Sequence, residues 1–207
     1  MDLFIFSIAA LTYSGISTLL YSYSYIAIIF LMALESASMP IPSEVLLPLV
    51  GKLSTSSYAS FHLNPYVAFT ASVIGTAIGI SIDYAIAYYL EKDIVYKHMD
   101  KFHISKKSLD SFDSWFSING AASVFFARLV PVMRGLISFP AGFAKMELKR
   151  FYIYSILGSM IWNAVLIGFG YYALSSSNPG MVLVSIAAFG IVLYLIYRVA
   201  SKKIRSE

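Results

Sequence analysis

The chain has 207 residues, of which 58% are hydrophobic and 13% are charged, whereas roughly a quarter of the residues are charged in an ordinary soluble domain. So few charges nearly exclude a soluble enzyme, and the absence of cysteine excludes a disulfide scaffold, a cysteine nucleophile and a cysteine-ligated metal site. The net charge of +4 is too small, and too scattered among apolar runs, to indicate a nucleic-acid partner. The length predicts one membrane domain over residues 1–207, and nothing in the composition requires a cofactor.

The N-terminal region is apolar and carries no Lys or Arg before Lys52. Residues 1–20 form either an interfacial helix or a first transmembrane helix, and the Ser, Thr and Gly residues within Leu3–Leu20 favour the interface. The run Tyr21–Leu34 is too short to cross a hydrocarbon layer of ~30 Å by itself, and becomes a span only with its flanks.

Three prolines interrupt the stretch of residues 35–52, namely Pro40, Pro42 and Pro48. Proline removes a helical hydrogen bond and restricts the residue before it, so this stretch cannot be one continuous helix. Split into two arms, it reaches only ~12 Å on each, less than half of a bilayer. We therefore predict a re-entrant hairpin that enters and leaves by the same face, with its loose backbone against protein or a wet cavity.

Three runs are long enough, or nearly so, to cross the membrane, namely residues 68–90, 151–174 and 181–197. The first of them is apolar except for hydroxyl groups, two glycines and Asp83. Gly75 and Gly79 form a small-xxx-small pair, a pattern that lets helices approach closely.

Residues 91–113 form the one strongly polar region, with five lysines and two histidines among several acids. We predict a soluble helical loop, and the positive-inside rule places it in the cytoplasm. The basic tail of residues 198–207 and the cluster of Lys145, Lys149 and Arg150 favour the same side. A multi-pass protein of the cell membrane with a cytoplasmic C-terminus follows. The three runs then point inward, outward and inward again.

Residues 120–144, like residues 35–52, form an apolar stretch that cannot be one continuous helix. Pro131 and Gly135 break the run, and both of its flanks are cytoplasmic by the charge pattern. We predict a second re-entrant hairpin, which enters from the opposite face. Each hairpin is followed by a span, the pattern of an inverted repeat with broken helices. The predicted fold is an all-α integral membrane protein, an inverted repeat with two opposed re-entrant helical hairpins plus transmembrane helices.

Four charges fall in or beside the hairpins: Glu35 and Glu44 in the first, Arg128 and Arg134 in the second. Left unpaired at the bilayer centre they would cost about 10 kcal/mol together, which is comparable to the stability of a whole protein. The least costly arrangement brings the two tips together, so that the carboxylates face the guanidinium groups. The planar fork of arginine also suits a phosphate that displaces the carboxylate.

Two alternatives stay open for these charges. The side chains can instead snorkel to the interface, and Glu44 can partner Ser43 at a helix start. For Asp83, the functional interpretation is an acid that lines a cavity, and the alternative is pairing with a lysine of the following loop. Trp162 and Asn163 are expected to pack helices, and the three histidines of the chain have no ligand-like spacing.

Several motifs together resemble the DedA family over about residues 25–172. As they stand in this chain, they are Glu35 with Pro40-Ile-Pro42-Ser-Glu44, the Gly75/Gly79/Tyr84 span, Phe126-Ala-Arg128-Leu-Val-Pro131-Val-Met-Arg134-Gly135 with Pro140-Ala-Gly142, Gly158-Ser-Met-Ile-Trp162, and Gly168-Phe-Gly170-Tyr171. The element Arg-x-x-Pro-x-x-Arg-Gly with an upstream Pro-x-Pro-x-Glu is specific in combination, although neither half is specific alone.

The resemblance implies a membrane protein with two opposed re-entrant hairpins. Members of the family are implicated in moving lipids between leaflets. Bacterial members recycle polyprenyl phosphate or phosphatidylethanolamine, with coupling to a proton or sodium gradient, and distant eukaryotic relatives scramble phospholipids. Carried over by position, the essential acids of the family fall on Glu35 and Glu44, and its essential arginines fall on Arg128 and Arg134.

One position departs from the family pattern. The family usually has an acid directly after the second glycine of the Gly75/Gly79 span, where this chain has Ile80. Asp83, one helical turn further on, is the acid that can substitute for it.

The leading hypothesis is a membrane lipid transporter, a flippase or scramblase, for a phosphate-bearing lipid such as polyprenyl phosphate or a phospholipid. The head group would bind Arg128 and Arg134, and Glu44, Glu35 and Asp83 would couple transport to H⁺ or Na⁺. Burial favours a neutral acid whereas arginine favours its anion, so a phosphate that takes over the arginines should promote protonation of the acids.

The alternatives are a membrane enzyme that modifies lipid phosphates and a membrane assembly factor that transports nothing. An enzyme such as a phosphatase needs a nucleophile and a general acid–base in the same pocket. Phosphate release would identify the enzyme, and transport by purified protein in liposomes would exclude the assembly factor.

Overall fold

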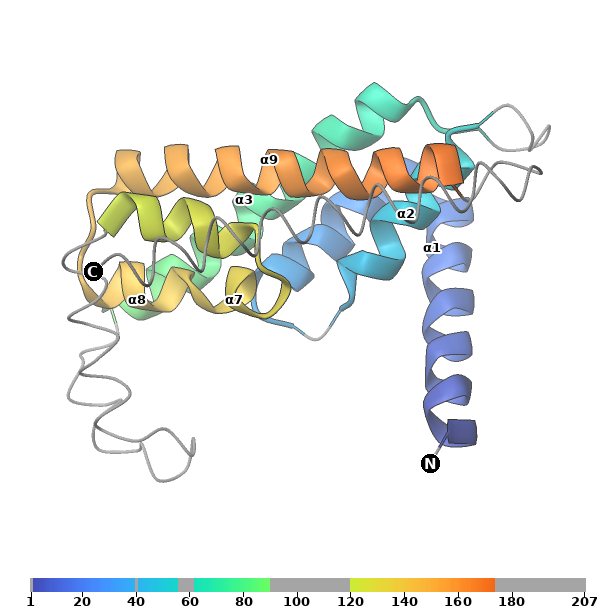
Figure 1. Ribbon diagram of the computed structural model, residues 1–207, viewed down its shortest axis with the longest axis horizontal. Helices are drawn as coiled ribbons and strands as arrows, with labels where there is room; N and C mark the ends of the chain where they lie inside the picture. The colour runs from blue at the N-terminus through green and yellow to red at the C-terminus, as the bar shows by residue number, and fades with distance from the viewer. Residues whose placement is uncertain (1, 40, 56–61, 90–119, 174–207) are drawn as a thin grey trace.

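The computed structural model describes residues 2–39, 41–55, 62–89 and 120–173, and its regular elements there are α-helices (Figure 1). The elements are α1 (Asp2–Ser36), α2 (Ser43–Leu53), α3 (Pro65–Tyr89), a helical segment of residues 120–128, α7 (Pro131–Leu136), α8 (Ser138–Phe143) and α9 (Leu148–Ala173). The polar loop, the third run and the basic tail of the sequence analysis lie outside the described residues.

Among the described residues, three helices are long and apolar enough to cross a membrane: Ser14–Ser36, Pro65–Tyr89 and Leu148–Ala173. They include two of the three runs predicted as spans. The first of these helices is bent at Ser24, whose φ of 49° and ψ of −120° are not helical. The arm before the bend runs across the direction of α9 in Figure 1. The part after it reaches only ~18 Å, well short of a hydrocarbon layer.

The helices α3 and α9 lie against each other and run in opposite directions (Figure 1). Their outer faces carry exposed aliphatic side chains every four residues, one helical turn apart. These side chains are Ile74, Ile78, Ile82 and Ile86 on α3, and Ile153, Leu157 and Ile161 on α9. Such continuous apolar faces suit contact with lipid rather than with water.

Two helical hairpins occupy the space beside these long helices. The end of α1 and α2 form the first hairpin, and its connection includes residues 37–39 and 41–42; residues 120–128 with α7 and α8 form the second. Their turns approach each other near the middle of the molecule (Figure 1). The first arm of the first hairpin belongs to the long helix α1, so this hairpin extends beyond the predicted residues 35–52.

Proline shapes α2 without ending it. The helix begins directly after Pro42 and contains Pro48, which has no N–H to donate to the carbonyl of Glu44. Tertiary packing retains the helix nonetheless, since most of its residues are buried, including Leu46, Leu47 and Val50.

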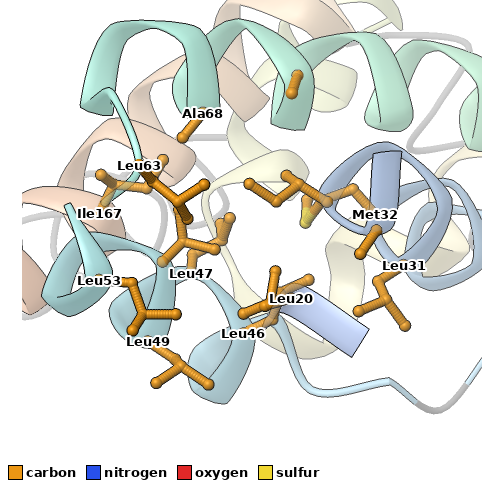
Figure 2. Close-up of a cluster of buried hydrophobic side chains, with 14 of the residues drawn as sticks. Leu20, Leu31, Met32, Leu46, Leu47, Leu49, Leu53, Leu63, Ala68 and Ile167 are labelled. Atoms are coloured by element: carbon orange, nitrogen blue, oxygen red, sulfur yellow. The ribbon is translucent and has the colours of Figure 1, made fainter. Parts of the chain in front are cut away.

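Each hairpin has its own hydrophobic cluster. The larger cluster joins α1, α2, the start of α3 and the later half of α9, and Figure 2 shows Leu20, Met32, Leu47, Leu53 and Ile167 among its members. The smaller cluster surrounds the second hairpin and consists of Ile80, Tyr84, Val124, Ala127, Ile137, Ala141 and Phe151. The polar side chains described below lie between the two.

Close contact between α1 and α3 depends on the predicted glycine pair. A Cβ atom on Gly75 would lie 2.8 Å from the Cβ of Met32, and one on Gly79 would lie 2.6 Å from the Cβ of Ser36. Real Cβ atoms do not approach so closely, so both positions require glycine. The prediction that these glycines permit close helix packing is confirmed.

Candidate functional site

Arg134, on α7 at the tip of the second hairpin, joins the two hairpins. Its Nη2 donates hydrogen bonds to Oε1 of Glu35, at the end of α1, and to Oγ of Ser43, at the start of α2. The same atom lies 3.9 Å from Oε1 of Glu44. Charge-assisted hydrogen bonds of this kind are about twice as strong as neutral ones. The predicted meeting of carboxylates and guanidinium groups therefore occurs at Arg134.

The ion pair is held from both sides. The Arg134 guanidinium carbon lies 5.4 Å from the centre of the Trp162 ring on α9, within the range of a cation–π interaction. The second carboxylate oxygen of Glu35 accepts a hydrogen bond of 3.0 Å from Ser36 Oγ. Glu35 and Arg134 are both buried, so neither snorkels to a surface within the described part of the chain.

Arg128 has different surroundings from Arg134, although the sequence predicts the same role for both. Its side chain is 2% exposed and forms no ion pair with any residue that the structure describes. It donates instead to the backbone carbonyl of Arg134 and, over 2.6 Å, to Ser138 Oγ. These bonds tie the first arm of its hairpin to α7 and α8. Its positive charge attracts Glu35 and Asp83 without forming an ion pair with either.

Glu44 is the outermost of the four charges. Its side chain is 42% exposed, and it lies in the first turn of α2, where the helix dipole favours a negative charge. Pro42 stands at the cap position and no side chain caps this helix. Glu44 thus acts at the helix start through its charge and also approaches Arg134.

Asp83 lies on α3, one helical turn beyond Ile80, and is 2% exposed. Its Oδ2 accepts a hydrogen bond of 2.6 Å from Oγ of Ser38 in the turn of the first hairpin. The same hydroxyl lies 3.1 Å from the carbonyl oxygen of Gly135 on the second hairpin. The lysines considered as alternative partners of Asp83 lie outside the described residues.

An open groove of about 310 Å³ lies between the tips of the two hairpins. Glu35, Glu44, Ser38 and Arg134 line it together with apolar side chains, and Met39 and Leu136 at its walls are exposed. Its volume is at the lower end of the range for small-molecule sites, and it combines an apolar wall with a few polar groups, as such sites do.

A much smaller cavity, of about 10 Å³, lies on the other side of the Glu35–Arg134 pair. Thr76 and Arg128 line it, and Oγ1 of the former and Nε of the latter have no hydrogen-bond partner among the described residues. Its size is about that of one water molecule. A water there would satisfy both groups, and a phosphate would not fit.

Several contributors to the site escaped the sequence analysis. Ser38 and Ser138 belong to no motif that the sequence analysis singled out, and Ser43 was considered only as a partner of Glu44, so only the fold shows that the three hydroxyl groups contact Asp83, Arg128 and Arg134. Trp162 was expected to pack helices, and its ring also contacts Arg134. Asn163 does join helices, because its Nδ2 donates to Ser72 Oγ over 3.0 Å. The described part of the chain has no cluster of three potential metal ligands.

Long apolar helices with an ion pair buried between two hairpins define a multi-pass membrane protein. A family model for the VTT domain matches residues 41–172. Undecaprenyl phosphate transporter A of Staphylococcus aureus is 30% identical over 182 residues, which cover 86% of this chain and 87% of the relative. The chain belongs to the DedA/VTT family of membrane proteins, so the resemblance seen in its motifs is confirmed.

Two further relatives carry other names. The alkaline phosphatase-like protein of Lactococcus lactis subsp. cremoris is 35% identical over 153 residues, covering 72% of this chain and 70% of the relative. Protein DedA of Escherichia coli is 24% identical over 132 residues, covering 64% and 59%. No solved structure matches the chain.

Proposed function

We propose that the protein moves a phosphate-bearing lipid between the leaflets of the membrane, as a flippase or scramblase. The observation that carries the proposal is the Arg134–Glu35 ion pair in the wall of an open groove between two hairpin tips. A relative that matches most of the chain is named undecaprenyl phosphate transporter A, which supports a polyprenyl phosphate as the substrate.

The two hairpins are the elements that we expect to be re-entrant, in an inverted repeat. The helix after the bend of α1 measures ~18 Å and α2, with its 11 residues, ~16 Å, so each arm reaches about half of a hydrocarbon layer. The antiparallel course of α3 and α9 supports this arrangement. By the positive-inside rule, the end of α3 and the C-terminus of the chain face the cytoplasm.

The phosphate head group would bind Arg134 in the groove while the lipid tail stays in the bilayer. A phosphate monoester carries a charge of about −1.5 to −2 and accepts bidentate hydrogen bonds from a guanidinium group, so it competes with Glu35 for Arg134. Arg128, which has no carboxylate partner among the described residues, adds a second positive charge behind the groove. Met39 and Leu136 provide apolar contacts for the first carbons of the tail.

Coupling to H⁺ or Na⁺ would use the acids around the same groove. Release of Glu35 from Arg134 leaves a buried carboxylate without its cation, which favours its protonation. Glu44 is the acid with direct access to the groove, and Asp83 is connected to it through Ser38. Departure of the lipid on the far side would restore the ion pair and release the proton.

The test is transport by the purified protein in liposomes that contain undecaprenyl phosphate, with and without a pH gradient. We expect Arg134→Ala to reduce the rate to that of protein-free liposomes. Arg134→Lys should remain at least ~10-fold slower than wild type, because a point charge does not reproduce the bidentate contact. Arg150→Ala is the matched control, since Arg150 is exposed and its ion pair within the described residues is with Glu147, at 3.0 Å.

Other results of this experiment would contradict either the phosphate clamp or the proposed transport. Near-normal transport by Arg134→Lys would show that a general positive field suffices and that no phosphate clamp exists. No transport by the wild type would refute the proposal in favour of an assembly factor. Release of inorganic phosphate would favour the alternative of a membrane enzyme that modifies lipid phosphates. The Lactococcus lactis relative is named an alkaline phosphatase-like protein, which is the reason to measure phosphate release.

A further inference from the structure

Among the residues that the structure describes, Ser38 in the turn of the first hairpin has a side chain that contacts both the second hairpin and α3. Its hydroxyl lies 2.6 Å from Oδ2 of Asp83 on α3 and 3.1 Å from the carbonyl oxygen of Gly135 on α7. Its backbone has a φ of 57°, a left-handed conformation that is uncommon for residues other than glycine. The first hairpin therefore holds this hydroxyl in place at a conformational cost.

The carboxylate of Asp83 depends on that hydroxyl. Within the part of the chain that the structure describes, Ser38 is the only hydrogen-bond donor to the Asp83 side chain. A buried carboxylate with a single neutral partner is poorly stabilised as an anion. Any event that withdraws the hydroxyl therefore favours the neutral acid.

The other titratable groups around Asp83 do not replace Ser38. Arg128, on residues 120–128, attracts the carboxylate without forming an ion pair with it. On the neighbouring α1 and α2, Glu35 and Glu44 face Arg134 of α7.

The tyrosine hydroxyls of this region are also engaged elsewhere. Tyr84, on α3 itself, donates its hydroxyl to the backbone carbonyl of Met146. Tyr152, on α9, shares a hydrogen bond with Ser81. Among the described residues, Arg128 therefore attracts Asp83 only at a distance, and no other donor forms a hydrogen bond with its carboxylate that could replace that of Ser38.

Ser38 also lines the groove, beside Arg134 and Glu44, and is exposed there. A phosphate oxygen in the groove is an anionic acceptor that the hydroxyl can reach by rotation about its Cα–Cβ bond. Donation to the phosphate would leave Asp83 buried and without a donor. The hydroxyl is thus positioned between two competing anions, one fixed and one that arrives with the ligand.

We propose that Ser38 is a positioning residue that couples binding of a phosphate head group in the groove to protonation of Asp83. On binding, the hydrogen bond from Ser38 to Asp83 breaks and one from Ser38 to the phosphate forms. The Asp83 carboxylate then takes up one proton from water and becomes a neutral acid. On release the three changes reverse. This inference rests on the proposed function, because it assumes that the groove binds a lipid phosphate.

The experiment measures the dissociation constant of undecaprenyl phosphate in detergent micelles between about pH 5 and pH 8. If binding takes up a proton, affinity falls as the pH rises, by up to about tenfold per pH unit where free Asp83 is ionised and bound Asp83 is neutral. Asp83→Asn should remove this extra slope. Titration of the phosphate itself contributes equally to all variants and cancels in the comparison.

Ser38→Gly provides the second arm. Glycine adopts a positive φ without strain, so this variant removes the hydroxyl while the turn is retained. Asp83 then lacks its donor in the free protein as well, and binding should take up no further proton, so the extra slope disappears here too. Thr70→Val, which removes an exposed hydroxyl bonded to the Tyr66 carbonyl of its own helix at 2.9 Å, is the control and should keep the wild-type slope.

The outcomes separate the two proposals. Equal pH slopes in wild type, Asp83→Asn and Ser38→Gly, with lipid bound by all three, would overturn the switch and leave the proposed function standing. A slope that is lost in Asp83→Asn but kept in Ser38→Gly would show that Asp83 titrates without Ser38, which also overturns it. Failure of the wild type to bind the lipid phosphate at any pH would refute the proposed function and the switch together.

Discussion

Gly158, on α9, is the position where one added methyl group should disturb the site from outside the groove. A Cβ atom there would lie 2.8 Å from the Cβ of Arg128 and 2.8 Å from the carbonyl oxygen of Phe125. Both neighbours are backbone or the base of a side chain, so they cannot rotate away, and the helical arm of residues 120–128 must shift. Overpacking of this kind costs about 1–3 kcal/mol of unfolding free energy.

The matched control is Gly168 on the same helix, where an added Cβ meets no heavy atom within 4 Å. Alanine replaces glycine there with a gain of about 0.5–1 kcal/mol from helix propensity alone. The assay is thermal unfolding of the purified variants in one detergent. Since 1 kcal/mol shifts the Tm of a chain of this size by about 2–4 °C, Gly158→Ala should lower it by about 2–12 °C and Gly168→Ala should raise it slightly. A Tm for Gly158→Ala at or above that of the wild type would refute the close packing of α9 against the Arg128 arm.

Two further predictions concern the surroundings of the ion pair and the topology. Trp162→Phe keeps a ring beneath Arg134 but weakens the cation–π interaction, so we expect a few-fold weaker binding of undecaprenyl phosphate, and unchanged affinity would mean that the ring only packs. The chain has no cysteine, so single cysteines can be placed freely. Lys101→Cys should react with an impermeant reagent only from the cytoplasmic side and His62→Cys only from outside, and the reverse pattern would invert the topology.

Charge and proline positions were sufficient to predict the coarse organisation. Apolar length separates the spans from the polar regions because an unpaired charge in hydrocarbon is costly. The prolines of residues 35–52 correctly indicated an interruption, since a turn does separate α1 from α2. The glycine pair on α3 was recognisable because its spacing of four residues places both on one face. These features are local or depend on composition, and one sequence suffices to show them.

Pairing at the site could not be predicted in the same way. The sequence presents Arg128 and Arg134 as equivalents, yet one contacts backbone and hydroxyl groups while the other contacts Glu35. Which acid faces which arginine depends on the rotation of each helix about its axis and on the bend of α1 at Ser24. The role of Ser38 could not be predicted from the sequence for a related reason, because its contact with Asp83 joins residues 45 positions apart.

Charge balance gives a physical reason to expect that lipid binding and protonation go together. Among the described residues, the buried charged side chains at the junction of the hairpins and α3 are Glu35, Asp83, Arg128 and Arg134, two of each sign, so these four charges balance when all are ionised. A phosphate monoester adds a charge of about −1.5 to −2 in a region of low dielectric constant, where an uncompensated charge is costly. If Glu35 and Asp83 become neutral, the two arginines are left to match the phosphate and the balance is restored.

A site with the arginines alone would bind phosphate strongly but release it poorly, whereas acids that regain their charge on deprotonation compete for the arginines and help to expel the lipid. Under the proposed function, the two buried acids would allow one site both to bind and to release an anionic head group.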